Sequence, residues 1–385
     1  MNIVIAIDSF KGSLPTEMSG AAVREAILSV DPAAAVRVCP LADGGEGFAR
    51  AVTSATGGRS VTATVTGPLG TPIVAEYGLL SDGRTAVIEM ATAAGLTLVP
   101  EGERSPMNTT TYGVGELIAH AMREHGCRRF LVGIGGSATN DGGIGMLSAL
   151  GFQFLDAQGR AVSPFGRGLA ELCEIRVDGV IAELAECEFL VACDVNNPLC
   201  GADGCSHVYG PQKGASLATV REMDAWLSHY AELTEAVLPN ADPNAAGAGA
   251  AGGLGYALMS YLGATLVRGI DLVIAETHLE DAIRDADLVI TGEGRLDGQS
   301  CMGKAPVGVA TCAKKYGKPV IAFSGAVTPD AGAVNAHGID AFFPILRTPC
   351  TLSEAMDAEN TYRNLRDTAE QAYRLFLCAR CKGDV

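Results

Sequence analysis

The chain has 385 residues, of which 48% are hydrophobic and 19% charged, and its formal net charge is −16. This composition is typical of a folded protein with two or three domains and excludes a largely disordered chain. The negative charge argues against nucleic acid or an anionic membrane as a partner, and no apolar run is long enough for a membrane span. Any anionic ligand would need backbone amides, lysines or Mg²⁺ to offset this charge. Twelve cysteines and a start without signal-peptide features predict a cytoplasmic location.

The first part of the chain alternates expected strands and helices. "NIVIAID" is a buried strand, a helix follows over 14–30 with Ser13 as its N-cap, and "AVRVCPLAD" is the next strand before a helix over 46–56. Residues 59–90 then show period-two alternation with Gly/Pro turns, which predicts an antiparallel ribbon.

Helical and apolar segments alternate again in the rest of the chain. We expect helices over 111–125, 143–150 and 352–380, and strands at 129–134, 188–195, 286–294, 319–327 and 341–346. The last three strands are continuous apolar runs, as in parallel strands that helices cover on both faces. The final helix has one apolar stripe, which predicts one buried face.

These patterns predict an α/β protein with two α/β domains. A flavodoxin- or Rossmann-like, doubly wound parallel-sheet domain is expected from residues 1–62 and 283–385. A second α/β domain containing the antiparallel ribbon is expected as an insertion at 63–282. We expect the active site in the cleft between the two domains.

Polar residues follow the expected strands at one position after another. Ligands of parallel α/β sheets bind beyond the carboxyl ends of the strands. A single acidic strand end is ordinary capping, but five such ends beside glycine or amide predict a cleft lined by Asp8, Asp43, Glu46, Asp141, Asp194, Glu293 and Asp297. Lys11 and Lys304 stand near these carboxylates in the sequence. Carboxylates, lysines and glycine loops together are typical of a Mg²⁺–nucleotide site.

Three segments are candidate phosphate-binding motifs. "GQSCMGKA" nearly matches a P-loop, but Ala305 replaces the hydroxyl that would reach Mg²⁺. "GIGGSA" (133–138) fits the dinucleotide pattern GxGxxA with Asp156 as the later acid, yet two glycines at 142–143 would weaken the helix that this pattern requires. We therefore interpret 133–141 either as a longer loop whose amides hold an anion or as a tight turn without a ligand. In "YGPQKGAS", Lys213 is a candidate anion contact.

A set of longer motifs resembles the glycerate kinase type-1 family. The motifs, which run from about residue 2 to 375, are "DSFKGSL", "ADGGEG", "GPLGTP", "AVIEMATAAGL", "TTTYGVGELI", "GIGGSATNDGGIGM", "CDVNNPLCG", "GPQKGA", "GAGAAGGLG", "DLVITGEGRLDGQS", "GKAPVGVA" and "GIDAFF". The chain departs from the family pattern at Ile7, Cys205, His207 and Gly298.

The resemblance implies a kinase that phosphorylates D-glycerate, a small-molecule substrate, with ATP and Mg²⁺. Bacterial members give 2-phosphoglycerate, whereas other glycerate kinases give the 3-phosphate. The family's architecture of one domain inserted in another agrees with the organisation expected above. Two other classes stay open: a dinucleotide-dependent oxidoreductase and a non-catalytic sugar-acid sensor. Formation of a homo-oligomer is also left open.

We assign roles to the candidate residues from their position and chemistry. Asp194 is the first candidate for the base that accepts the hydroxyl proton, and Asp43 is the second. Lys11, with Ser13 and nearby amides, is expected to bind the glycerate carboxylate. The remaining substrate-binding candidates are Asp8, Asn196 and Asn197.

The nucleotide and metal are assigned to separate groups. Asp297 and Glu293 are expected to bind Mg²⁺. Lys304 or Lys213 is expected to offset charge on the transferred phosphoryl group. The phosphate-binding loop is expected to use Gly135, Gly136, Ser137, Thr139, Asn140 and Asp141.

Overall fold

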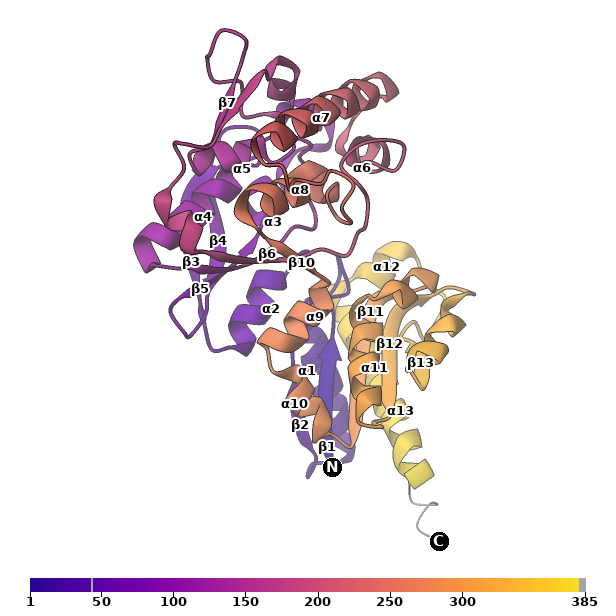
Figure 1. The fold of residues 1–385 in the computed structure, drawn as a ribbon. Coiled ribbons are helices and arrows are strands. Elements are labelled where there is room, and N and C mark those ends of the chain that lie inside the picture. Colours follow the sequence, from indigo (N-terminus) through magenta and orange to yellow (C-terminus); the bar gives the residue numbers. More distant parts are fainter. Residues whose placement is uncertain (43, 381–385) are drawn as a thin grey trace. The chain divides into compact units, whose positions relative to one another are not determined.

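The computed structural model describes residues 1–42 and 44–380, which form two compact units. Unit 1 comprises residues 1–43 and 270–385, and unit 2 comprises residues 44–269. The boundaries predicted from the sequence, after residues 62 and 282, fall inside strand β3 (Arg59–Thr66) and helix α10 (Leu279–Arg284). Both units are mixtures of sheet and helix, so the predicted α/β class is confirmed (Figure 1).

The described part of unit 1 contains a five-stranded sheet in the order β13-β12-β11-β1-β2. All four strand pairings are parallel. In chain order within the unit this is the flavodoxin-like arrangement 2-1-3-4-5, and the strand order reverses between β1 and β11. The strands are β1 (Asn2–Ile7), β2 (Ala35–Val38), β11 (Leu288–Leu296), β12 (Val320–Val327) and β13 (Ala341–Pro344).

Helices cover the two faces of this sheet (Figure 1). Helices α1 (Thr16–Val30) and α13 (Ala358–Arg380) pack against each other, and α11 (Ala305–Lys315) packs against β1 and β11. Apolar side chains of α1, α13 and the central strands form one buried core. This agrees with the apolar sequences of the strands, because parallel strands covered by helices on both faces are buried. The unit also contains α9 (Gly269–Glu276), α10 and the short α12 (Leu352–Met356).

Two local predictions in unit 1 are wrong. Ser13 is not an N-cap, because α1 begins at Thr16 and its cap position, Pro15, offers no side-chain hydrogen bond. The helix expected over 352–380 is divided, because Asp357 adopts an extended conformation between α12 and α13. The buried stripe of the final helix is confirmed for Leu365, Ala369, Ala372 and Tyr373.

The main sheet of unit 2 has the strand order β10-β9-β6-β5-β4-β3. Strands β5, β6, β9 and β10 are parallel, whereas β3 and β4 form the antiparallel ribbon that the period-two pattern predicts. The strands are β3, β4 (Pro72–Leu79), β5 (Thr85–Glu89), β6 (Arg129–Gly133), β9 (Glu188–Ala192) and β10 (Thr265–Val267), with a separate hairpin of β7 (Gln153–Leu155) and β8 (Glu174–Arg176).

Helices of unit 2 bury a second, larger apolar core on this sheet. Helix α2 packs on β4 and β5, while α4 and α5 pack against each other. The helices are α2 (Phe48–Ala55), α3 (Ala91–Ala94), α4 (Tyr112–His125), α5 (Ile144–Ala149), α6 (Cys205–Tyr209), α7 (Leu217–Val237) and α8 (Ala250–Leu262). No helix among the described residues has both the length and the apolar character that a membrane crossing requires.

Candidate active site

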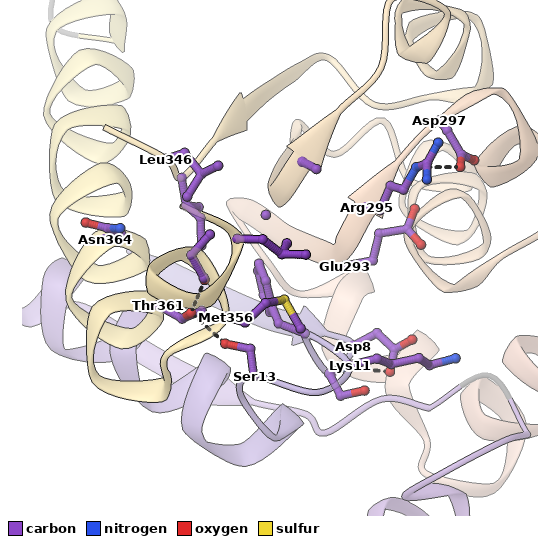
Figure 2. Close-up of a pocket in the computed structure, with 18 of the residues that line it drawn as sticks. Asp8, Lys11, Ser13, Glu293, Arg295, Asp297, Leu346, Met356, Thr361 and Asn364 are labelled. Carbon is purple, nitrogen blue, oxygen red and sulfur yellow. Dashed lines mark hydrogen bonds and ion pairs between the residues drawn. The ribbon is translucent and has the colours of Figure 1, made fainter. Parts of the chain in front are cut away.

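A pocket of about 550 Å³ opens at the carboxyl ends of the strands of unit 1 (Figure 2). Its lining comes from the segments after β1 and β13, from the ends of β11 and β12, and from α12 and α13. The pocket includes residues of the segment after β1 and residues at the end of β11, the two neighbouring strands between which the strand order reverses. This is the position at which flavodoxin-like sheets bind their ligands.

The turn after β1 supplies Asp8, Lys11 and Ser13 to this pocket. The backbone N–H of Asp8 donates to Gly292 of β11 at 3.0 Å, and Phe10 and Leu14 exchange two backbone hydrogen bonds that close the turn. Asp8 is only 5% exposed, and its carboxylate accepts the N–H of Ser9 at 2.7 Å. Lys11, by contrast, is exposed at the tip of the turn.

Ser13 links this turn to the start of α13. Its hydroxyl lies 2.6 Å from the hydroxyl of Thr361, which also donates to the carbonyl oxygen of Ala355 at 3.0 Å. The sequence assigned Ser13 to the cap of the following helix because Ser/Thr before a helix usually caps it. The contact with Thr361 could not be predicted from the sequence, because the two residues are 348 positions apart in the chain.

Strand β11 and the segment after it supply Glu293, Arg295 and Asp297. Glu293 is 8% exposed, and its Oε1 accepts the hydroxyl of the fully buried Ser300 at 2.5 Å. The same Ser300 hydroxyl accepts the backbone N–H of Asp297 at 3.2 Å. One serine therefore holds both predicted magnesium-binding residues in place.

Two cations lie next to Asp297 in the same pocket. The guanidinium of Arg295 is 3.3 Å from one carboxylate oxygen, and the ammonium of Lys304 is 3.9 Å from the other. Lys304 occupies the cap position of α11 and its side chain is 36% exposed. Arg295, within the motif "GEGRLD", is a further cation of the pocket that was not predicted from the sequence.

The pocket thus gathers three carboxylates and three cations from unit 1. Six of the residues assigned from the sequence line it: Asp8, Lys11, Ser13, Glu293, Asp297 and Lys304. In the described part of the chain no three His, Cys, Asp or Glu side chains are placed to hold a metal by themselves. Mg²⁺ in nucleotide sites needs only one or two carboxylates besides phosphate oxygens and water, so Glu293 and Asp297 fit that donor set.

In unit 2, the glycine loop after β6 is mostly buried. Only Gly135 and Gly136 leave backbone accessible, whereas the side chains from Ser137 to Asp141 lie inside the unit. Gly142 and Gly143 adopt left-handed conformations, and a Cβ atom on Gly143 would collide with Ala257 of α8. Close packing therefore explains this glycine pair, which stands before α5.

Lys213 is buried and forms hydrogen bonds with the glycine loop after β6. Its side chain is 2% exposed, and its ammonium donates to the hydroxyl of Ser137 at 2.8 Å and to the carbonyl oxygen of Thr139 at 2.6 Å. Burial lowers the pKa of Lys213 to about 8. In this structure Lys213 contacts the loop itself.

Asn140 and Asp141 are also committed to internal hydrogen bonds. The amide of Asn140 donates to Ser206 at 2.9 Å. Asp141 accepts the backbone N–H and the hydroxyl of Thr111, both at 2.7 Å, and the N–H of Gly143 at 3.2 Å. Burial raises the pKa of Asp141, and these hydrogen bonds oppose that effect.

The segment after β9 contains three further candidates. Asp194 is exposed, and its Oδ1 accepts the N–H of Gly269 at 2.9 Å. Asn197 donates to the carbonyl oxygen of Asp203 at 2.8 Å and accepts the hydroxyl of Tyr209 at 2.6 Å, whereas Asn196 is exposed. Asp43, the second candidate base, lies outside the described residues.

Glu89 is a buried carboxyl group that was not predicted as a functional residue from the sequence. It ends β5, pairs in register with Gly133, and is 6% exposed. Its Oε2 accepts the backbone N–H of Gly47 at 3.0 Å and of Ala49 at 3.5 Å, at the start of α2. Burial raises its pKa to about 7, although these hydrogen bonds lower it. The carboxyl group thus fixes the end of the loop "GGEG" and the start of α2 to the carboxyl end of β5, an interior strand of the sheet.

The dinucleotide pattern has no matching fold around it. After β6 and α5 the chain enters β7, which pairs antiparallel with β8 and not parallel with β6. Asp156, the expected ribose-binding acid, instead accepts the N–H groups of Gln158 and Arg160 at 2.8 and 2.9 Å in the following turn. The local geometry is therefore not that of a dinucleotide-binding βαβ unit.

Comparisons with known proteins all identify glycerate kinases as the proteins most similar to this chain among those reported below. A sequence model of the glycerate kinase family matches residues 3–377. The chain is 50% identical to glycerate 2-kinase of Escherichia coli K12 over 92% of this chain and 93% of that protein, and 48% identical to glycerate kinase of Bacillus subtilis 168 over 96% and 97%. A crystal structure from Salmonella typhimurium LT2, provisionally assigned as glycerate kinase 2, superposes with a TM-score of 0.88, 46% identity and 99% coverage of both chains.

Proposed function

Because the chain belongs to the glycerate kinase family, we propose that it transfers the γ-phosphoryl group of ATP to the 2-hydroxyl of D-glycerate. The observation that carries this proposal is the pocket of unit 1, in which three carboxylates and three cations surround a space for a small anionic ligand. ADP and 2-phosphoglycerate are the products. The 50% identity to a relative named glycerate 2-kinase supports the choice of hydroxyl.

We assign recognition of the substrate carboxylate to Lys11. It is the exposed cation of the rigid turn after β1, and the pocket wall beside it includes the hydroxyl groups of Ser9 and Ser13. A charge-assisted hydrogen bond from a lysine to a carboxylate is about twice as strong as a neutral one. This contact would select acids over neutral polyols.

Glu293 and Asp297 are the proposed magnesium ligands. When bound, Mg²⁺ would neutralise phosphate oxygens and orient the nucleotide. Ser300 keeps the Glu293 carboxylate and the Asp297 backbone at fixed positions. Arg295 and Lys304 flank Asp297 and would offset the negative charge on the transferred phosphoryl group.

Asp194 remains our proposal for the group that orients the hydroxyl and accepts its proton. It is an exposed carboxylate beyond the end of β9, and its Oδ1 is fixed by the N–H of Gly269. In the glycine loop the exposed Gly136 is our candidate for backbone contact with phosphate, because the N–H of Gly135 already donates to the carbonyl oxygen of Gly44 at 3.3 Å; the buried Lys213 supports that loop.

The proposal is tested by a coupled assay of ADP release with D-glycerate, ATP and Mg²⁺. Phosphorus NMR of the product distinguishes the 2-phosphate from the 3-phosphate. We expect ADP release that depends on D-glycerate and a 2-phosphate signal. Consumption of NAD(H) would identify an oxidoreductase, and glycerate binding without ADP release would identify a sensor; either result contradicts the proposal.

A further inference from the structure

The pocket of unit 1 has a second, apolar end. Figure 2 shows Leu346 and Met356 on the side of the pocket away from Arg295 and Asp297. The apolar lining also includes Ile345, Leu352 and Ala355. Leu346 and Met356 are each 40% exposed, and Leu352 is 78% exposed. Exposed apolar side chains grouped in a concave site indicate a ligand with an apolar face.

The apolar end is held in place by hydrogen bonds. Thr351 and Glu354 form a capping box at the start of α12, which fixes the helix that presents Leu352 and Met356. Thr361 donates to the carbonyl oxygen of Ala355 and contacts Ser13, so α12 is joined to the turn after β1. The subsite is therefore preformed next to the charged end.

An amide group stands at this apolar end. Asn364 of α13 lines the pocket, is half-buried, and its side chain makes no hydrogen bond with the described residues. An asparagine amide can pair with the N6 amino group and N7 of adenine, because it offers one acceptor and one donor. Guanine presents two acceptors, O6 and N7, at the same edge, so the amide cannot pair with both.

We propose that this apolar end is the subsite for the adenine base of ATP, with Asn364 at the edge of the base. The inference rests on the proposed kinase function and concerns the same pocket. D-Glycerate has no apolar face, and a volume of about 550 Å³ exceeds what a three-carbon acid fills. The charged end, where Arg295 and Lys304 flank Asp297, then accommodates the phosphates, and Lys11 remains for the glycerate carboxylate.

The first test replaces exposed apolar residues, so that folding is little affected. In Leu346→Ser and Leu352→Ser we expect the KM for ATP and the Kd for ADP to rise about tenfold, since each loses roughly 1.4 kcal/mol of apolar contact with the base. The KM for D-glycerate, the kcat at saturating ATP and the affinity for inorganic triphosphate should stay within about twofold. Leu375→Ser, 63% exposed on α13 and outside the pocket lining, is the matched control.

Three results would overturn the base subsite. They are a rise in the KM for D-glycerate without a rise for ATP, unchanged ADP affinity in both variants, and a loss of oligomers on gel filtration with ADP binding unchanged. The last result would make the apolar end a protein interface. ADP titration needs no substrate, so it tests the subsite even if the wild-type protein does not phosphorylate glycerate.

The second test concerns the selectivity for the base. We expect Asn364→Ala to lower the ratio of kcat/KM for ATP to that for GTP by about tenfold, as one lost bidentate pair would do. Asn364→Gln, which keeps the amide, should retain more of the preference than the alanine variant. An unchanged ratio in Asn364→Ala would exclude this residue from base recognition.

Discussion

The hydroxyl of Ser300 donates to the carboxylate of Glu293 at 2.5 Å in the interior of unit 1. Ser300 has no exposed surface, and the same hydroxyl accepts the backbone N–H of Asp297. A single side chain thus connects the two proposed magnesium ligands. Partners of this kind orient ligands and set their basicity without touching the ion.

We expect Ser300→Ala to raise the free Mg²⁺ concentration that gives the half-maximal rate by roughly 10–100-fold, because the carboxylate of Glu293 loses its orienting donor. The measurement is the initial rate against free Mg²⁺ at saturating ATP and D-glycerate. Ser148→Ala, which removes a 2.7 Å hydrogen bond to Ile144 in α5, is the control and should leave this dependence unchanged. An equal effect in both variants would point to general destabilisation.

We expect Asp194→Asn to lower kcat by about 10²–10⁴-fold, since the amide cannot accept the hydroxyl proton. The amide oxygen can still accept the N–H of Gly269, so the fold should persist. Steady-state kinetics together with circular dichroism check both statements. Near-normal turnover would remove Asp194 as the base and leave Asp43 as the next candidate.

The titration of Glu89 should make stability fall as pH rises through neutrality. Its pKa in the folded protein is about 7, above the ordinary value of 4.5, so the folded state binds more protons between these values. Stability is therefore greatest below pH 4.5 as far as this group is concerned, and it is lost up to about pH 7. Glu89→Gln should remove roughly 1–3 kcal/mol of this pH dependence.

Urea unfolding of the wild type and Glu89→Gln at pH 5, 6, 7 and 8 measures the effect. The variant should gain stability relative to the wild type as pH rises. Glu103→Gln, an exposed residue, should follow the wild-type curve. Parallel curves for wild type and Glu89→Gln would mean that Glu89 stays ionised in the folded protein.

We expect Lys213→Met to destabilise unit 2 by about 1–3 kcal/mol, because Ser137 and the carbonyl oxygen of Thr139 lose a buried donor. Denaturant unfolding measures this loss, and Lys318→Met, at a half-buried lysine of unit 1, is the control. The pKa of about 8 also predicts that the wild type gains stability between pH 8 and 10, where the unfolded chain binds more protons. The methionine variant should lack this gain.

The sequence predicted most of the regular structure. Continuous apolar runs correctly located β11, β12 and β13, and period-two alternation correctly located the β3–β4 ribbon. Local rules failed where a distant residue decides the outcome. Ser13 contacts Thr361 instead of capping α1, and Asp357 divides the final helix although the apolar stripe continues beyond it.

The same limit applies to the candidate site. Six residues chosen for their place after a strand line one pocket, because parallel strands bring their carboxyl ends to one edge. Periodicity gave no sign that Lys213 would be buried under residues 137–139, or that Asn197 would bind Tyr209. Glu89 was missed because its partners, Gly47 and Ala49, are remote in sequence, and Asn364 because nothing in the sequence shows that α13 contributes to the pocket.

Strand β1 lies between β2 and β11, and Ile3 is paired with Leu288. During synthesis at roughly 5–20 residues per second, the nascent chain reaches β11 only on the order of tens of seconds after β1. Unit 2, whose residues are continuous in the chain, is translated completely within that interval. One edge of the apolar strand β1 therefore stays without its partner β11 during synthesis, while unit 2 can already fold. The sheet of unit 1 can be completed only after unit 2 has been translated.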